Sequence, residues 1–234
     1  MTTRKRADKK EKHPWDYQFK LNEGFTLNDT HNSFVELAKH HDTKMVLVDG
    51  PAGTAKTYLA TFAGLTLLQR KNVERLVYIR SVVESASQKM GSLPGEVEDK
   101  FLPWSMPLIE KLDELAGIPG RMNLLNSQLI ECVPVNFVRG LTFNDSVVIV
   151  DEAQNLTRSE LVTILTRFGA NSKFVVIGDS NQSDINGKSG FGPIYNCFDN
   201  KSSEREGIFT FKFTGDDIVR REILKFIVKK LDTL

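Results

Sequence analysis

Residues 50–57 read Gly-Pro-Ala-Gly-Thr-Ala-Lys-Thr and combine small side chains with one amine and one hydroxyl. Small residues let the backbone approach a ligand closely, and successive N–H groups at the start of a helix bind phosphate oxygens. Lys56 would then neutralise the β- and γ-phosphates, and the Thr57 hydroxyl would bind Mg²⁺. The spacing predicts a Walker A loop with the nucleotide-binding residues Gly50, Pro51, Ala52, Gly53, Thr54, Ala55, Lys56 and Thr57. A glycine-rich turn between a strand and a helix is the alternative.

Ala55 stands where the Walker A signature has its second glycine. If the backbone at this position needs a positive φ, alanine costs on the order of 1 kcal/mol relative to glycine. The substitution therefore raises the prospect of weaker nucleotide binding or slower turnover.

An acidic pair, Asp151 and Glu152, follows the apolar run at residues 147–150. This pattern is typical of a Walker B strand, in which the first acid holds Mg²⁺, directly or through Thr57. The second acid can orient and deprotonate an attacking water. Capping of the next helix is the alternative, since the helix dipole favours acids near its start. Together with the loop at 50–57, the pair favours a nucleoside triphosphatase.

A third polar segment, residues 178–182, follows the apolar run at 174–177. A glutamine at such a strand end can hydrogen-bond both the γ-phosphate and the attacking water. We therefore expect Gln182 to act as a γ-phosphate sensor. A plain surface turn of Gly, Asp, Ser and Asn is the alternative.

Phosphoryl transfer also needs a cation opposite the developing charge, commonly an arginine that a neighbouring subunit supplies. Arg167, Arg220 and Arg221 are the candidates. Arg167 closes the predicted helix after the Walker B segment, where its alternative role is to favour the carboxyl-terminal dipole. The other two lie early in the predicted last helix, where cations are mildly disfavoured, so a functional role suits one of them.

The elements that must position these groups repeat along the chain as an apolar run, a polar turn and a helical segment. Apolar runs occupy residues 45–48, 76–79, 147–150 and 174–177. Unbroken apolar strands are covered on both faces, which is typical of a parallel sheet between helices. Ligands then bind at the carboxyl ends of the strands. The sequence predicts a three-layer α/β domain with a mostly parallel sheet, helices at 56–70, 96–115, 157–168 and 216–231, and an edge strand at 208–213.

Composition limits the remaining choices. The chain has 234 residues with 40% hydrophobic content, enough for a proper core, and its net charge of +1 gives no strong pull toward nucleic acid or membrane. Six basic residues against two acidic ones lie within residues 1–15. We expect residues 1–24 to form a basic, disordered tail and residues 25–234 to form the domain. The tail is either a solvent-exposed leader that keeps the chain in solution or a segment that contacts nucleic acid through its charge.

From about residue 25 to the end, the ordered motifs resemble those of the PhoH-like ATPases, relatives of the amino-terminal motor domain of superfamily 1 helicases. Residues 50–57 resemble the family's GPAGTGKT loop, and residues 151–155 its DEAQN strand end. Further matches in the family's order are residues 93–95 with Lys100 and Pro103, Arg139-Gly140 with Thr142, residues 165–167, Gly178-Asp179 with Gln182 and Asp184, and Val219-Arg220.

The resemblance implies a RecA-like P-loop core in which the strand ending at Gly178 lies between the Walker A and Walker B strands. It also implies ATP and Mg²⁺ as ligands, association with RNA or single-stranded nucleic acid, and a homo-oligomeric ring, with a hexamer favoured. Three residues depart from the family pattern: Ala55 replaces a loop glycine, Leu141 replaces the second arginine of RGRT, and His31 aligns with the adenine-reading glutamine.

Two functions follow as expectations. The first is a Mg²⁺-dependent ATPase in which Lys56, Glu152 and Gln182 act on ATP, Thr57 and Asp151 hold the metal, and Arg167 or Arg220 completes the site. The alternative is a nucleotide-gated assembly or nucleic-acid-binding module whose hydrolysis is vestigial. No run reaches the length of a membrane-spanning helix, so no membrane partner is expected. The expected location is the cytoplasm, or the host cytoplasm for a viral source.

Overall fold

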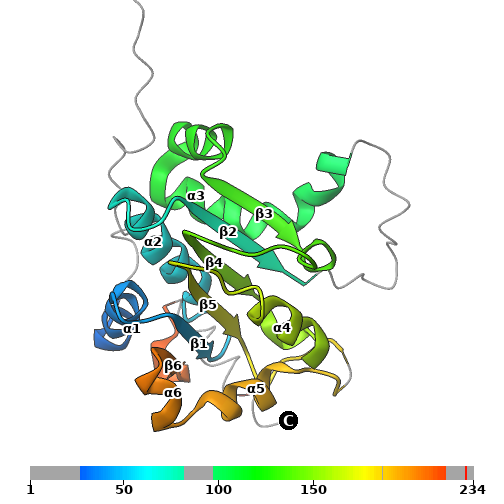
Figure 1. Ribbon diagram of the computed structural model, residues 1–234. Helices are drawn as coiled ribbons and strands as arrows, with labels where there is room; N and C mark the ends of the chain where they lie inside the picture. Colours follow the sequence, from blue (N-terminus) through cyan, green and yellow to red (C-terminus); the bar gives the residue numbers. More distant parts are fainter. Residues whose placement is uncertain (1–26, 82–96, 186, 220–229, 231–234) are drawn as a thin grey trace, which may run out of the picture.

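The computed structural model describes residues 27–81, 97–185, 187–219 and 230. Within these ranges the chain forms one six-stranded sheet with helices on both faces (Figure 1). The predicted basic tail and most of the predicted helix at 216–231 lie outside the described residues.

The strands run parallel to one another in the order β3-β2-β4-β5-β1-β6. Their bounds are β1 (Met45–Asp49), β2 (Arg75–Arg80), β3 (Ile130–Pro134), β4 (Ser146–Asp151), β5 (Lys173–Gly178) and β6 (Ile208–Lys212). The expectation of a mostly parallel sheet is confirmed, as is the place of β5 between β1, which precedes the predicted Walker A loop, and β4, which ends at the predicted Walker B acids. The predicted edge strand is β6, at one end of the sheet.

Helices cover both faces of this sheet. The α-helices are α1 (Asp29–Lys39), α2 (Lys56–Gln69), α3 (Val97–Asn126), α4 (Arg158–Leu165), α5 (Phe191–Phe198) and α6 (Lys201–Arg205). Short 3-10 turns are η3 (Val135–Phe137), η4 (Ala153–Asn155) and η5 (Gly215–Asp217). None of the described helices combines the length and the apolar character that a bilayer crossing requires.

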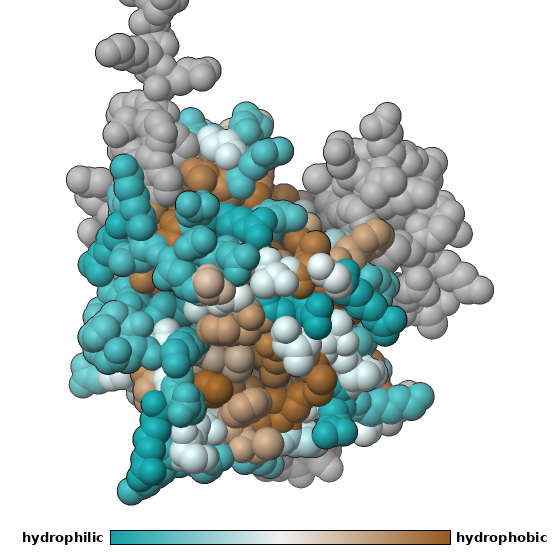
Figure 2. All heavy atoms as spheres, in the orientation of Figure 1, coloured by the Kyte–Doolittle hydropathy of each residue, from teal (hydrophilic) through white to brown (hydrophobic). Residues whose placement is uncertain are grey.

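Side chains that alternate between the two faces of the sheet form two hydrophobic cores, one on each face. Val46 and Val48 of β1 pack with α1, α2 and α3, whereas Met45 and Leu47 pack with α4 and α5. Because side chains on a strand point alternately to opposite faces, a continuous apolar run serves both layers at once. This arrangement confirms the three-layer architecture. In the view of Figure 2, hydrophilic side chains gather over α1 and α2, and apolar atoms reach the surface near α5.

Several helix ends differ from the sequence prediction. The helix expected at 157–168 begins after the Thr157 cap, which forms a capping box with Glu160, and ends at Leu165. The helix expected at 96–115 extends to Asn126 across a break at Gly117, whose φ of 69° is not helical. Thr214 and Asp217 form a capping box, and the described turn that it caps is η5.

Candidate active site

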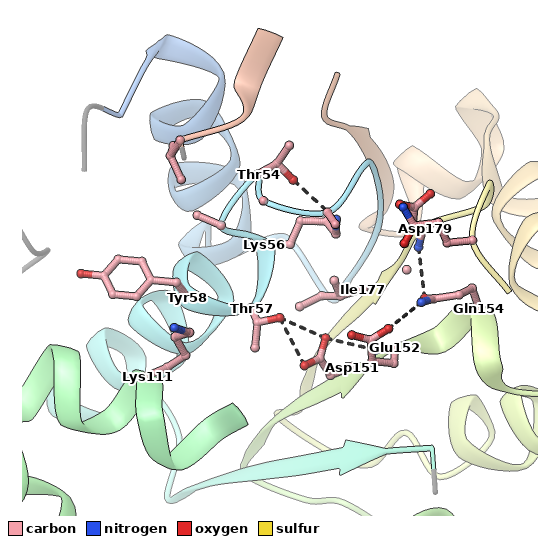
Figure 3. A pocket seen from close by; sticks show the side chains of 16 residues that line it. Thr54, Lys56, Thr57, Tyr58, Lys111, Asp151, Glu152, Gln154, Ile177 and Asp179 are labelled. Carbon is pink, nitrogen blue, oxygen red and sulfur yellow. Dashed lines mark hydrogen bonds between the residues drawn. The ribbon is translucent and has the colours of Figure 1, made fainter. Parts of the chain in front are cut away.

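A cavity of about 260 Å³ lies at the carboxyl ends of β1, β4 and β5 (Figure 3). Parallel strands place their carboxyl ends at one edge, so the polar residues after each strand meet there. The lining residues are Ala52, Gly53, Thr54, Ala55, Lys56, Thr57, Tyr58, Lys111, Asp151, Glu152, Gln154, Ile177, Gly178, Asp179, Gln182 and Val219. Loop 50–57 and the residues after β4 and β5 therefore share one cavity.

The loop between β1 and α2 is closed by its own hydrogen bonds. The Lys56 Nζ donates to the carbonyl oxygens of Gly50 at 2.5 Å and Pro51 at 2.8 Å. The Thr54 hydroxyl also donates to the Pro51 carbonyl, at 3.0 Å, and the Val219 N–H donates to the Gly53 carbonyl at 3.1 Å. The partners of the Lys56 amine are thus neutral carbonyls. A phosphate oxygen carries a negative charge and would bind the amine more strongly than they do.

Ala55 adopts a left-handed backbone conformation, with φ 60° and ψ 20°. It is the residue before α2, and its side chain makes no capping bond. The position therefore has the positive φ that the sequence analysis considered, and alanine there costs about 1 kcal/mol relative to glycine.

Burial and charge act on Lys56 in opposite directions. Burial lowers its pKa, whereas the carboxylates of Asp179, Asp151, Glu152 and Asp49 raise it. Because desolvation is the larger effect, the net direction is downward. The cavity thus combines the Lys56 ammonium group with several carboxylates, which suits an anionic phosphate that is accompanied by a divalent cation.

Asp151, at the end of β4, is fixed from several sides. The Thr57 hydroxyl lies 3.1 and 3.2 Å from the two carboxylate oxygens, the Glu152 N–H donates at 3.1 Å, and the Tyr78 hydroxyl donates at 2.6 Å. Burial and the neighbouring carboxylate raise the pKa of Tyr78, so the phenol stays protonated as a donor. A carboxylate beside a hydroxyl is the oxygen-rich donor set that Mg²⁺ prefers, so these residues fit that ion.

Glu152 has a strained backbone, with φ 54° and ψ 41°. Its Oε2 accepts a hydrogen bond from Gln154 Nε2 at 2.5 Å, and its Oε1 lies 3.6 Å from Arg80 Nη2. Left-handed conformations of residues other than glycine cluster at functional sites, where surrounding contacts maintain them.

The segment after β5 is tied to both neighbouring strand ends. The Asp179 N–H donates to Gln154 Oε1 at 3.1 Å, and Ser180 donates through its N–H and its hydroxyl to Asp49, each at 2.8 Å. The Gln182 N–H donates to the Asp179 carbonyl at 3.1 Å. Further along, Asp184 and Asn155 exchange two hydrogen bonds. Gln182 is thereby held at the cavity wall between the two other motifs.

The predicted arginines do not join this group among the described residues. Arg167 lies in the turn after α4, where its Nη2 donates to the Thr166 hydroxyl, and it does not line the cavity. Arg220 and Arg221 fall outside the described residues. His31 lies near the cavity but is buried, and its Nδ1 accepts from the Asn28 N–H at the start of α1.

The structure adds residues to which the sequence analysis gave no role: Tyr78, Arg80, Lys111, Gln154 and Asp49. Both Tyr78 and Arg80 belong to β2: Tyr78 lies within its apolar run, and Arg80 ends the strand. Lys111 reaches the cavity from α3 and also donates to Glu114 at 2.7 Å. The sequence signal for Gln154 was its place in the DEAQN match at residues 151–155.

Comparison with known families decides the relationship. The profile of the family described as PhoH-like protein matches residues 26–232. The chain belongs to the PhoH-like protein family. PhoH-like proteins from Mycobacterium tuberculosis (strain ATCC 25618 / H37Rv) and Bacillus subtilis (strain 168) are 36% and 32% identical to it, over 76% and 85% of this chain. These matches cover 50% and 61% of the two relatives, so this PhoH-like chain spans about half the length of the curated relatives it matches.

A solved structure supports the fold of this PhoH-like chain. The large terminase from a thermophilic bacteriophage superposes with a TM-score of 0.52 at 11% identity, over 88% of this chain and 50% of the terminase. At that identity the likeness concerns the fold alone. The PhoH-like chain therefore has the RecA-like P-loop NTPase fold.

Proposed function

We propose that this chain is a Mg²⁺-dependent ATPase that hydrolyses ATP to ADP and phosphate. The observation that carries the proposal is that Lys56, Thr57, Asp151, Glu152 and Gln182 all line one cavity. Each of these side chains supplies a different requirement of phosphoryl transfer, and three separate strand ends bring them there.

Binding falls to the loop after β1. Backbone N–H groups of residues 50–57 and the amino terminus of α2 cradle the phosphates, and Lys56 leaves the Gly50 and Pro51 carbonyls to neutralise them. Thr57 and Asp151 would hold Mg²⁺, which when bound neutralises charge on the β- and γ-phosphates. Tyr78 keeps the Asp151 carboxylate in the orientation that this requires.

Hydrolysis falls to the residues after β4 and β5. A water oxygen attacks the γ-phosphorus, the bond from that phosphorus to the bridging oxygen breaks, and the proton of the water passes to Glu152. Gln182 hydrogen-bonds the attacking water and a γ-phosphate oxygen. The products are ADP and inorganic phosphate.

Partners complete the proposal. A homo-oligomeric ring, with a hexamer favoured by the family, would let Arg220 or Arg167 of one subunit reach the γ-phosphate of the next. We propose that binding of RNA or single-stranded nucleic acid is coupled to ATP hydrolysis. The proposed location is the cytoplasm. Mass measurement with and without ATP tests the ring, because nucleotide should favour the larger species.

Replacing the proposed base tests the catalytic assignment. Glu152→Gln keeps the size and the polarity of the side chain but cannot accept the proton, so phosphate release should fall at least roughly 10²-fold while ATP still binds. Glu131→Gln is the matched control, since Glu131 pairs with Arg75 at 3.3 Å at the far end of the sheet. Wild-type turnover in Glu152→Gln would contradict the assignment of the base.

Ala55 favours one second candidate. A residue with a side chain at φ 60° in the phosphate loop suits a nucleotide-gated assembly or nucleic-acid-binding module with vestigial hydrolysis. That candidate predicts ATP-dependent association by light scattering with almost no phosphate release.

A further inference from the structure

Glu152 is not free in this structure, because each of its carboxylate oxygens has a partner. Gln154 Nε2 lies 2.5 Å from Oε2, and Arg80 Nη2 lies 3.6 Å from Oε1. The two partners come from different elements: Gln154 belongs to η4, and Arg80 ends the neighbouring strand β2. Both ends of the carboxylate are therefore held at once.

The two contacts differ in kind. The Arg80 guanidinium is a charged partner that holds Oε1, an oxygen that a water molecule would otherwise reach. Gln154 is neutral, and its 2.5 Å hydrogen bond orients the carboxylate through the other oxygen, Oε2. The Arg80 and Glu152 side chains are 27% and 39% exposed, so their contact can open toward solvent.

Gln154 also links the carboxylate to the third motif. Its Oε1 accepts from the Asp179 N–H at 3.1 Å, and its backbone carbonyl accepts from the Ser183 hydroxyl at 3.2 Å. Gln182 lies between these two residues in sequence and lines the same cavity. One buried side chain thus connects the proposed base with the segment that carries the proposed γ-phosphate sensor (Figure 3).

We propose that Arg80 restrains Glu152 in a resting position and that Gln154 is the positioning residue that keeps the carboxylate aligned for water. The inference rests on the proposed ATPase function and concerns the regulation of its rate. Release of Arg80 accelerates hydrolysis, and loss of Gln154 slows it, so the two residues act on the same carboxylate with opposite sign.

Arg80→Gln tests the restraint. Phosphate release at saturating ATP should rise about two- to fivefold, the range expected for loss of a partly exposed ion pair. Arg75→Gln is the matched control, because it removes the same charge from the other end of β2, where Arg75 pairs with Glu131. This control should leave the rate unchanged.

The outcomes separate the two proposals. A rate in Arg80→Gln equal to or below that of the wild type overturns the restraint while leaving the ATPase intact. If neither the wild type nor Arg80→Gln releases phosphate although both bind ATP, the ATPase proposal itself is contradicted, and this inference with it. Release by Arg80→Gln from a silent wild type supports both.

Gln154→Met and Gln154→Glu test the positioning role. Both variants should lower kcat with little change in the KM for ATP, since neither removes a phosphate contact. In Gln154→Glu the loss should be at least as large as in Gln154→Met, because the introduced carboxylate repels Glu152 where the amide donated to it. An unchanged kcat in either variant, or a rise in KM as large as the fall in kcat, overturns the positioning role.

Discussion

Two lysines, Lys56 half-buried and Lys173 buried, lie at opposite ends of the sheet, and their hydrogen bonds are alike. At the carboxyl end, Lys56 donates to the carbonyls of Gly50 and Pro51. At the amino end, Lys173 begins β5 and donates to the carbonyls of His40 and Thr43, just beyond α1. Both amines are desolvated, and burial lowers the pKa of each.

Their surroundings differ. Four carboxylates act on Lys56, which faces a cavity lined by residues from three strand ends, whereas Asp42 alone opposes the desolvation of Lys173. Lys173 also lines a cavity, but that cavity has no acidic lining residue in the described part of the chain. A lysine bonded to carbonyls is therefore not evidence of catalysis. The opposing charges around Lys56 are what suit it to a phosphate and a metal ion.

The strongest test of this difference removes each amine in turn. Lys56→Ala should lower ATP turnover at least roughly 10²-fold, because it removes a preorganised cation that faces the transferring phosphate. Lys173→Met should leave turnover within about twofold, since its amine only satisfies carbonyls at the far end of the sheet. Phosphate release by both variants, each checked for folding by circular dichroism, gives the answer. Equal losses of turnover in the two variants would show that Lys56 has no special role compared with Lys173.

The second test uses pH, and it concerns the amino end. Burial lowers the pKa of Lys173 from 10.5 to about 8, so between these values the unfolded chain binds more protons than the folded chain. The free energy of unfolding should therefore rise with pH through this window, as the buried charge is lost. Relative to Lys173→Met, the wild type should gain up to about 3 kcal/mol between pH 7.5 and 10.5.

Urea unfolding of both proteins across this pH range measures the gain, and titrations of other groups cancel in the difference. A difference between the two proteins that does not change with pH would show that Lys173 is not desolvated.

Sequence patterns located the central strands and the loop at residues 50–57, because both depend on neighbours in the chain. The apolar runs of β1, β2, β4 and β5 are buried throughout, which a run of four apolar residues reports directly. The strand β3 was not predicted, because it lies at the sheet edge and its partly exposed sequence Ile-Glu-Cys-Val-Pro has no such run.

Contacts across the sheet could not be predicted in the same way. Tyr78 reads as one more apolar residue of β2, and its partner Asp151 lies 73 positions away. The contact follows only from the parallel register of β2 with β4, which sets Arg80 beside Asp151. The contact of Arg80 with Glu152 depends on that register too, so a single sequence without the fold could not indicate it.

The third test asks whether a buried hydroxyl at the carboxyl end serves the ligand site. Tyr78→Phe removes the donor to Asp151 and should lower the free energy of unfolding by about 1–2 kcal/mol. It should also raise the Mg²⁺ concentration that gives half-maximal turnover, because Asp151 is less well oriented. Tyr195→Phe, on α5, is the matched control and should leave the Mg²⁺ dependence unchanged. An equal Mg²⁺ response in the two variants would assign Tyr78 to the core alone.

The smallest expected effect concerns backbone strain. Ala55 at the phosphate loop and Gln128 before β3 both have positive φ, at 60° and 55°. Ala55→Gly and Gln128→Gly should each stabilise the fold by up to about 1 kcal/mol, because glycine adopts this conformation without a steric penalty. For a working ATPase, turnover should stay within about twofold of the wild type in both variants.

A large rate increase confined to Ala55→Gly would instead show that alanine has suppressed hydrolysis, as the vestigial alternative requires. Because Gln128→Gly relieves the same kind of strain away from the cavity, it separates an effect on the phosphate loop from a general gain in stability. Thermal unfolding and phosphate release, measured on the same three proteins, therefore decide whether the strain at Ala55 merely lowers stability or also limits the chemistry.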